Sequence, residues 1–385
     1  MKNVLQIVLV NIGLFSILII VAELVFGNWF SAPALWNLGI YRDVQWSYGM
    51  EDSYRRTTPV IHTRDYYGFR GTYDSIGSVN VLAIGGSTTE ESGVSDHETW
   101  SEVFERCMKK HDVLVEIANA GISGQSTVGH IANFDIWLNK IDGLAPKYIL
   151  AYFGVNEQQL DGRADTHDAL QNVGARSWWK NFRINIKMNS AIFILYRTIK
   201  GNLIAFATGI HPLKMKVYSP STPAALRTTQ EKIDDELRGP DAPRFSINSD
   251  QYLEWYQLAQ RRFAKPLDRF EGRLEQLRKK IIAFGAKPIF VTQRAGNYRL
   301  RKGILNGNIG APKNDEPTYF WITLLSERTM SYCKKNRMTC VDLGSHIRFD
   351  DGDFYDPLHT TPTGSEKIGR HICDNLTQHL EFDIR

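Results

Sequence analysis

Residues 79–89 read Val79-Asn-Val-Leu-Ala-Ile-Gly-Gly-Ser-Thr-Thr89. An apolar run rich in β-branched residues ends there in two glycines and a serine, which predicts a buried strand that turns sharply into a helix. Such a turn places the hydroxyl of Ser87 at the carboxyl edge of a sheet. It also places the backbone N–H of Ser87 at a helix N-terminus, where negative charge is stabilised. Taken alone, the string fits a simple loop of an α/β protein at least as well.

A second string, near the C-terminus, supplies a base and a carboxylate. It reads Asp356-Pro-Leu-His359 and is followed by a stretch with a helical pattern. A tight turn over these four residues lets the aspartate hold one imidazole nitrogen while the other nitrogen faces a serine. In that arrangement the histidine takes the serine proton and the aspartate fixes the histidine tautomer. A loop histidine beside a capping aspartate is the structural alternative.

Two further strings follow predicted strands between these two. Asn119-Ala-Gly-Ile-Ser-Gly124 follows a strand predicted over 113–118, and Asn156 follows a strand predicted over 147–153. The carboxyl ends of parallel strands share one edge of the sheet, where ligands bind. We therefore expect the backbone N–H of Gly124 and the side-chain amide of Asn156 to reach an oxyanion at that edge. A turn glycine and a helix N-cap are the alternative readings of these two residues.

These four strings, in this order, resemble the sequence blocks of the SGNH (GDSL-like) hydrolases. The nucleophile, glycine, Gly-x-Asn and final blocks of that family correspond to Gly85-Gly-Ser87, Asn119 to Gly124, Gly154-Val-Asn156-Glu157 and Asp356-x-x-His359. Two positions depart from the family pattern: Gly86 stands where the family has aspartate, and Glu157 replaces the commoner aspartate. Neither change touches a predicted catalytic atom. The match covers roughly residues 79–160 and 285–375.

The resemblance implies a role for each of five residues. Ser87 is the nucleophile, His359 the base, and Asp356 the carboxylate that orients the base. The N–H groups of Ser87 and Gly124 and the amide of Asn156 form the oxyanion hole. No metal or organic cofactor takes part in such a reaction.

The predicted elements alternate between strands and helices. Strands are expected near 79–86, 113–118, 147–153, 287–293 and 339–343, with helices between them, which is typical of an α/β fold with a parallel sheet. We predict a flavodoxin-like three-layer α/β/α architecture with five parallel strands. A long helix over roughly 251–284 carries an apolar stripe that covers the sheet. This domain spans 79–385, holds an insert at about 160–250, and follows an irregular lead-in over 30–78.

Composition restricts the function classes. The chain has 385 residues with 43% hydrophobic and 11% aromatic residues, which suits a packed core rather than a disordered chain. The net charge of +4 does not suggest a nucleic-acid partner. No glycine-rich nucleotide-binding string follows a predicted strand. The sequence leaves the oligomeric state open.

The N-terminal segment over 4–26 is long and apolar enough to span a bilayer, and Glu23 is its only charged residue. Lys2 precedes it and the next basic residue is Arg42, so the charge bias places the rest of the chain outside the cytoplasm. We predict an uncleaved anchor that makes the protein a single-pass membrane protein. A cleaved signal peptide is the alternative, with Ala32-Pro-Ala34 as a loose cleavage site.

Four cysteines have no metal-type spacing. Outside the cytoplasm, Cys107 could pair with Cys373, and Cys333 with Cys340, because each pair falls on elements that can meet. Four buried thiols are the equal alternative.

Two further segments are candidates for binding. Residues 169–230 contain nine Lys or Arg and no Asp or Glu, interleaved with aromatic residues, which fits an anionic membrane surface or an anionic glycan as well as a merely solvated helical subdomain. The loop 294–313 follows the fourth predicted strand at the edge that carries Ser87. We predict that Arg294 and Tyr298 in this loop bind substrate, with a plain surface loop as the alternative.

The sequence therefore predicts a membrane-anchored, extracytoplasmic serine esterase that works through an acyl-enzyme. The expected substrate is an O-acyl group, an acetyl group in particular, on a cell-envelope or exported carbohydrate. Three alternatives stay open: an acyltransferase to a polysaccharide, a lipid esterase, and a non-catalytic glycan-binding protein.

Overall fold

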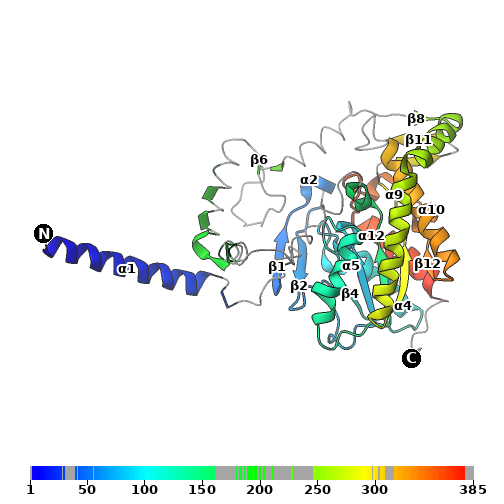
Figure 1. The fold of residues 1–385 in the computed structure, drawn as a ribbon. Helices are drawn as coiled ribbons and strands as arrows, with labels where there is room; N and C mark the ends of the chain where they lie inside the picture. The colour runs from blue at the N-terminus through cyan, green and yellow to red at the C-terminus, as the bar shows by residue number, and fades with distance from the viewer. Residues whose placement is uncertain are drawn as a thin grey trace.

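A five-stranded parallel sheet forms the centre of the structure, which is a computed structural model (Figure 1). It describes residues 2–27, 29–30, 40, 42–54, 56–160, 246–296, 298–301, 304–307 and 316–377, with scattered residues between 179 and 228. In their order across the sheet, the strands are β12 (Cys340–Val341), β9 (Lys287–Val291), β5 (Tyr148–Tyr152), β3 (Val81–Gly85) and β4 (Ile117–Asn119).

This strand order is the flavodoxin-like order that the sequence predicts. The first strand along the chain, β3, lies between the second, β4, and the third, β5, and it pairs with both in parallel. From β3 the chain passes to β4 on one side, and it then crosses over to β5 on the other side of β3. The order of the strands across the sheet therefore reverses between β3 and β5. In open α/β sheets, ligands bind outside the carboxyl ends of the strands at such a reversal. Ser87 follows β3 and Asn156 follows β5, so both lie at this point of the fold.

Helices cover both faces of the sheet, because both faces of its strands are apolar. Leu82 and Ile84 of β3 pack in one core with helices α5, α9 and α10, whereas Val81 and Ala83 pack in a second core with α4 and α12. Successive side chains of a strand point to opposite faces, so a strand buried on both sides is apolar throughout. The helices that form these layers are α4 (Trp100–Lys110), α5 (Thr127–Ile136), α9 (Ser249–Ala283), α10 (Glu316–Lys335) and α12 (Pro362–Leu376).

The remaining elements are short, apart from the N-terminal helix. Among the continuously described stretches, the other α-helices are α1 (Lys2–Phe26), α2 (Glu51–Tyr54), α3 (Ser87–Glu90) and α11 (Leu343–His346), and scattered helical residues also lie between 179 and 203. The 3₁₀ turns are Asp96–Glu98, Leu138–Lys140, Val155–Leu160 and Asp351–Asp353. The strands outside the central sheet are β1 (Val44–Tyr48), β2 (Val60–Arg64), β6 (Ile210–His211), β7 (Arg227–Thr228), β8 (Ser246–Ile247), β10 (Tyr298–Arg301) and β11 (Ile304–Gly307).

All five predicted strands are present, and each is shorter than predicted. The largest change is in β4, which begins at Ile117 rather than at Val113. Just before it, the carbonyl of Glu116 accepts from the backbone N–H groups of both Asn80 and Val81. The long predicted helix is α9, whose first turn is closed by a reciprocal pair of hydrogen bonds between Asn248 and Gln251. That capping box explains why the helix begins two residues earlier than its apolar stripe indicates.

The lead-in segment is more regular than the sequence predicts. β1 and β2 form an antiparallel pair, and two buried arginines, Arg64 at the end of β2 and Arg70 after it, attach the pair to the core. The guanidinium of Arg70 donates to the carbonyls of Glu91 and Val94, each at 2.9 Å, and it pairs with Asp96 at 2.8 Å. The long connection between β1 and β2 lacks a tight-turn signal, so no sequence pattern indicates this pair.

The loop over 294–313 also contains strands that were not predicted. β10 and β11 form a hairpin, and β11 pairs with β8, which comes directly before α9. The described part of this loop is therefore a small antiparallel sheet rather than a plain surface loop. Most of the basic insert over 169–230 lies outside the described residues.

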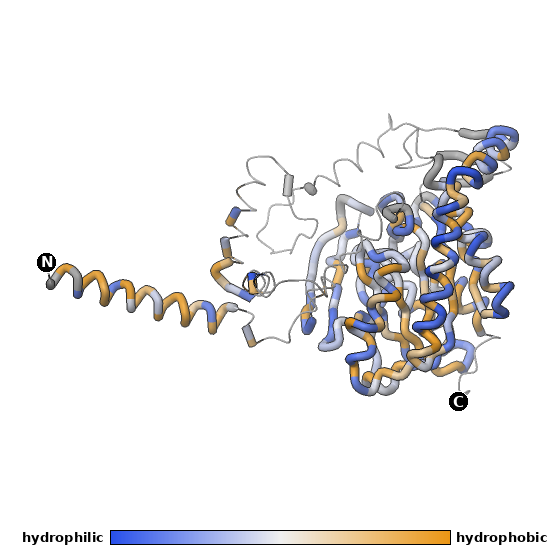
Figure 2. The backbone as a smooth tube through the Cα atoms, in the orientation of Figure 1, coloured by the Kyte–Doolittle hydropathy of each residue, from blue (hydrophilic) through white to orange (hydrophobic). Residues whose placement is uncertain are grey.

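Helix α1 extends away from the body of the protein and is apolar along its length (Figures 1 and 2). Residues Gln6–Phe26 have a mean hydropathy of 2.6, and none of them is a buried residue. Within the part of the chain that the structure describes, this is the one helix long and apolar enough to cross a membrane. An anchor and a signal sequence share this property.

Two disulfides join elements of the fold. Cys107 of α4 bonds to Cys373 of α12, and Cys333 of α10 bonds to Cys340 of β12. Disulfides persist in oxidising compartments. Together with the apolar N-terminal helix, they favour a location outside the cytoplasm.

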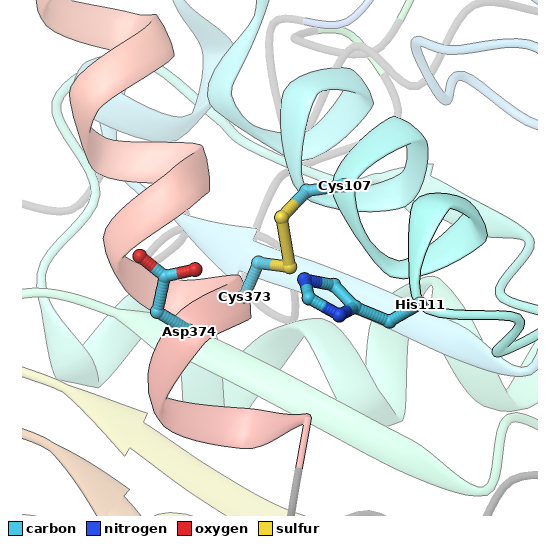
Figure 3. Close-up of side chains that lie close together, drawn as sticks. All are labelled: Cys107, His111, Cys373 and Asp374. Atoms are coloured by element: carbon cyan, nitrogen blue, oxygen red, sulfur yellow. A yellow bond between two sulfur atoms is a disulfide. The ribbon is translucent and has the colours of Figure 1, made fainter.

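One of these disulfides lies in a group of metal-type side chains (Figure 3). The ligand atoms of Cys107, His111, Cys373 and Asp374 all lie within 4.8 Å of one another. Thiolates, however, are the form in which cysteines bind metals. Because both sulfurs are joined to each other, this group holds a cross-link between α4 and α12 rather than a set of free ligands.

Candidate active site

The turn after β3 brings Ser87 to the carboxyl edge of the sheet, and two glycines make the turn possible. A Cβ on Gly85 would lie 2.0 Å from the hydroxyl of Thr89, and a Cβ on Gly86 would lie 2.3 Å from the amide nitrogen of Asn156. The turn therefore has no room for side chains at these positions.

His359 and Asp356 meet Ser87 in one hydrogen-bonded line. The Nε2 atom of His359 lies 2.8 Å from the Ser87 hydroxyl, and its Nδ1 atom lies 2.6 Å from a carboxylate oxygen of Asp356. The other carboxylate oxygen of Asp356 accepts from the backbone N–H groups of Leu358 and His359, both at 2.7 Å. The tight turn expected from the sequence thus presents base and carboxylate together.

The electrostatics of this turn favour an ionised aspartate. Burial alone would raise the pKa of Asp356, but the adjacent His359 and the hydrogen bonds from His359 and from two backbone N–H groups outweigh it, so the pKa lies below its usual value. An ionised carboxylate at Nδ1 keeps the proton there and leaves Nε2 to accept the proton of Ser87.

The two predicted oxyanion-hole residues lie next to each other beside the serine turn. Asn156 donates one amide N–H to the carbonyl of Gln125 at 2.8 Å, which fixes the amide against Gly86. Its second N–H is not used by that bond. Gly124 precedes Gln125 and has a positive φ of 78°, a conformation that favours glycine. The role of Ser87, Gly124 and Asn156 as an oxyanion hole stays a prediction.

Glu157, the second departure from the family pattern, is a buried structural link. Its carboxylate accepts from the backbone N–H and the hydroxyl of Thr127 at 2.7 and 3.0 Å. It also pairs with Arg273 of α9 at 2.7 Å. The longer side chain thereby joins the end of β5 to α5 and α9, which holds the neighbouring Asn156 in place.

Sequence reasoning missed the aromatic support of the histidine. The ring of Tyr355 stacks on the imidazole of His359, with centroids 5.7 Å apart and planes 15° apart, and the ring of Tyr54 in the lead-in also stacks on Tyr355. The hydroxyl of Tyr54 donates to the carbonyl of Gly93 at 2.7 Å. Tyr355 could have been noticed as a neighbour of Asp356 in sequence. No local pattern connects Tyr54, about 300 residues away, to this site.

A second missed residue is Glu91, which is buried directly behind the histidine turn. Its carboxylate accepts from the hydroxyls of Thr360 and Ser365 at 3.0 and 2.5 Å and from the backbone N–H of Trp100 at 2.6 Å. Burial raises the pKa of Glu91 to about 7, against the opposing effect of these hydrogen bonds. Since Thr360 follows His359 directly, Glu91 fixes the backbone that carries the base.

A cavity of about 250 Å³ opens at the neighbouring strand ends, beyond β9. Arg294 lines it, as expected of a binding residue, and its guanidinium donates to the carbonyl of Ile347 at 3.3 Å. Other lining residues come from α9, α10, α11 and the loop after β9, and they include Tyr252, Gln293, Tyr319, Ser326 and Glu327.

The structure corrects the expectation for Tyr298. This residue has no exposed surface, and its ring packs against Tyr319 of the cavity wall with centroids 5.4 Å apart. A fully buried ring cannot touch a substrate in this conformation. Tyr298 therefore supports the wall of the cavity from behind.

The cavity and the serine turn are connected through the loop after β9. The amide nitrogen of Gln293 donates to the hydroxyl of Thr88, next to Ser87, at 2.7 Å. The backbone N–H of Gly296 donates to the carbonyl of Pro357, within the histidine turn, at 2.8 Å. This loop therefore contacts both the turn that carries Ser87 and the turn that carries His359 and Asp356.

Comparisons with known proteins find fold relatives only. No family model and no curated protein matches the chain. Similar solved structures include a catalytic mutant of Axe2, an acetylxylan esterase from Geobacillus stearothermophilus, at 10% identity over 79% of this chain and 95% of that chain, with a TM-score of 0.40. Another is a member of the lipolytic protein G-D-S-L family from Veillonella parvula, at 11% identity over 78% and 98%, with a TM-score of 0.39. Likenesses this distant say nothing about activity, so the function must be argued from the site.

Proposed function

We propose that this protein is an SGNH-type serine esterase, anchored by α1 and active outside the cytoplasm. The observation that carries the proposal is the line from Ser87 to His359 at 2.8 Å and from His359 to Asp356 at 2.6 Å. A nucleophile, a base and an orienting carboxylate in mutual hydrogen bonds form the arrangement of a serine hydrolase.

The proposed reaction has two halves. The hydroxyl oxygen of Ser87 attacks the acyl carbon of an ester while Nε2 of His359 takes the hydroxyl proton. The negative oxygen that forms is stabilised by the N–H groups of Ser87 and Gly124 and by the free N–H of Asn156. When the C–O bond to the alcohol breaks, His359 returns the proton to the leaving oxygen. Water then attacks the acyl-enzyme with the same base, which releases the acid and restores Ser87.

The proposed substrate is a short O-acyl ester, an acetyl ester in particular, on a carbohydrate of the cell envelope or an exported one. The cavity of about 250 Å³ has the size for a small ligand. None of the proposed catalytic residues lines it, and it meets the serine turn through Gln293, which donates to Thr88. The lining of the cavity combines tyrosines with Arg294, Ser326 and Glu327, which pairs apolar rings with hydrogen-bonding groups as a sugar requires. The apolar N-terminal helix and the two disulfides support the location.

Ester hydrolysis by the purified full-length chain in detergent tests this proposal. We expect the parent protein to hydrolyse acetyl esters and to release acetate from an acetylated polysaccharide. Ser87→Ala should lower the rate by on the order of 10³ or more. Ser331→Ala is the matched control, because Ser331 is an exposed serine on α10, far in sequence from each proposed catalytic residue. Equal activity of Ser87→Ala and the parent would overturn the proposal.

The same assay separates the other activities. A lipid esterase would prefer long acyl chains over acetyl. An acyltransferase would release acetate slowly in water alone. When a sugar acceptor is added, it would transfer the acyl group to that acceptor at a higher rate. A binding protein would retain acetylated polysaccharide without turnover.

A further inference from the structure

Glu23, the one charged residue of the predicted membrane span, does not point to solvent. Its carboxylate accepts from the hydroxyl of Ser190 at 2.6 Å and from the backbone N–H groups of Ala191 and Ile192 at 3.0 and 3.3 Å. The indole N–H of Trp29 donates to the same carboxylate at 2.9 Å. The end of α1 is therefore joined to a segment about 170 residues away in the chain.

That segment starts as a helix at the carboxylate. The described residues of 191–203, which are 191–193, 195–196, 199–200 and 203, are all helical. The first backbone N–H groups of a helix have no partner within the helix. Glu23 accepts two of them, and its negative charge suits the positive end of the helix dipole. A carboxylate inside an apolar span thus has a structural reason to be there.

The helical segment exposes an apolar stripe. Five of its residues are between 43% and 64% exposed, namely Ile192, Leu195, Tyr196, Ile199 and Leu203. Their spacing of three, four, seven and eleven residues from the first confines them to an arc of about 100° on a helix. A continuous stripe of large apolar side chains is unfavourable in water, so it indicates a contact surface.

The position of this stripe points to a lipid surface as its partner. Glu23 lies three residues before the end of α1 at Phe26, which at 1.5 Å per residue is about 5 Å within the end of the span. Helices that lie in a membrane interface bury their apolar face to about 5–10 Å. The stripe therefore begins at the depth where an interfacial helix lies.

Two neighbouring features match the same surface. Trp29 and Phe30, directly after α1, are 40% and 79% exposed, as aromatic residues of a membrane interface are. The ammonium of Lys200 lies 5.9 Å from the ring centre of Tyr196, at the border of the stripe. A lysine there can cover apolar surface with its stem and place its charge among lipid headgroups.

We propose that the described helical residues between 191 and 203 lie in the outer interface of the bilayer, with their apolar stripe in the lipid, and that Glu23 clamps them to the membrane anchor. The protein would then contact the membrane through two elements, one that spans it and one that lies along it. This proposal does not depend on the esterase activity.

Site-specific fluorescence quenching in vesicles tests the stripe. The full-length chain is reconstituted in phosphatidylethanolamine and phosphatidylglycerol, and an environment-sensitive dye is attached to Leu195→Cys or Ile199→Cys. Lipids with a quencher near the headgroup should quench both dyes several-fold more than a dye at Tyr66→Cys. Tyr66 is the matched control because it is 54% exposed and belongs to the lead-in rather than to the stripe.

Two results would overturn this part of the proposal. Quenching at 195 and 199 no greater than at 66 would show that the stripe is not in lipid. Quenching that disappears in phosphatidylcholine vesicles would mean that the charge of the insert, not the apolar stripe, makes the contact. Quenching that persists in these vesicles supports the stripe.

Glu23→Ala tests the clamp separately. With the dye at 195, loss of the carboxylate should reduce quenching several-fold, while a dye at Phe15→Cys in the middle of α1 should keep its quenching by deeply placed quenchers. Unchanged quenching at 195 in this variant would overturn the clamp. Esterase assays on the same samples fail or succeed independently, because Ser87 lies in another part of the chain.

Discussion

Two neighbouring parts of one sheet edge are built in opposite ways. Beyond β3 and β5 the groups are in direct contact, because a Cβ on Gly86 would lie 2.3 Å from the amide nitrogen of Asn156 and the Ser87 hydroxyl lies 2.8 Å from Nε2 of His359. Beyond β9 the edge is hollow and forms a cavity of about 250 Å³. Gln293 belongs to both parts, since it lines the cavity and donates to Thr88 beside the serine.

The difference indicates that one part of the edge serves proton transfer and the other serves substrate recognition. Proton transfer needs fixed groups in direct contact, so the residues proposed for it come from short strings that fold into tight turns. Recognition needs space and varied contacts, so the cavity draws residues from α9, α10, α11 and the loop after β9. Changes in the filled part should therefore alter the rate of reaction, and changes in the hollow part should alter binding.

The largest expected effect comes from the base. His359→Ala should lower kcat by on the order of 10³ or more, because nothing else in the filled part takes the serine proton. Asp356→Asn should cost less, since the imidazole remains and only its orientation and charge balance are lost. Steady-state ester hydrolysis measures both. A greater loss in Asp356→Asn than in His359→Ala would contradict the assigned roles.

The next effect concerns the oxyanion. Asn156→Ala should reduce kcat by about 10²–10³ with little change in KM, because its free N–H contacts only the charge that develops during reaction. Asn375→Ala is the matched control on the exposed side of α12. A change confined to KM would assign Asn156 to the binding part of the edge instead.

Glu91 tests how strongly the filled part depends on pH. Burial raises its pKa to about 7 from an ordinary 4.5, so the folded protein holds this proton more tightly than the unfolded chain. The free energy of unfolding that protonated Glu91 contributes is fully present below pH 4.5 and is lost as the pH rises through 7. By linkage the loss is up to about 3 kcal/mol.

Glu91→Gln imitates the protonated form, because an amide can donate to Ser365 and Thr360 and still accept from Trp100. The variant should therefore gain stability over the parent as the pH rises from 5 to 8, measured by urea unfolding. Some pH dependence should remain, since burial also raises the pKa of Glu105 to about 7. Identical pH profiles of parent and variant would show that Glu91 is not the titrating group.

The smallest effect belongs to the hollow part. Arg294→Ala should raise KM for an acetylated carbohydrate about tenfold, the worth of one hydrogen bond to a charged group, and leave kcat nearly unchanged. Lys334→Ala, an exposed cationic residue on α10, serves as the control. A kcat effect equal to that of Asn156→Ala would mean that the two parts of the edge are not separate in function.

The sequence predicts those parts of the site that are formed by residues adjacent in the chain. The turn after β3 and the string from Asp356 to His359 each carry their geometry in a few adjacent residues, so both could be predicted, as could the five strands. The cavity, the stack of Tyr54 on Tyr355 and the burial of Tyr298 depend on segments far apart in the chain. No periodicity or turn signal encodes such contacts, because they arise only when the layers pack.

Covalent labelling of the intact protein tests the central claim most directly. A fluorophosphonate probe reacts with a serine whose hydroxyl is activated by a base, so mass spectrometry of the full-length chain identifies that serine. We predict one adduct on the peptide that contains Ser87, lost in Ser87→Ala, greatly slowed in His359→Ala and retained in Ser331→Ala. A folded parent protein that stays unlabelled, or an adduct that persists in Ser87→Ala, would contradict the account.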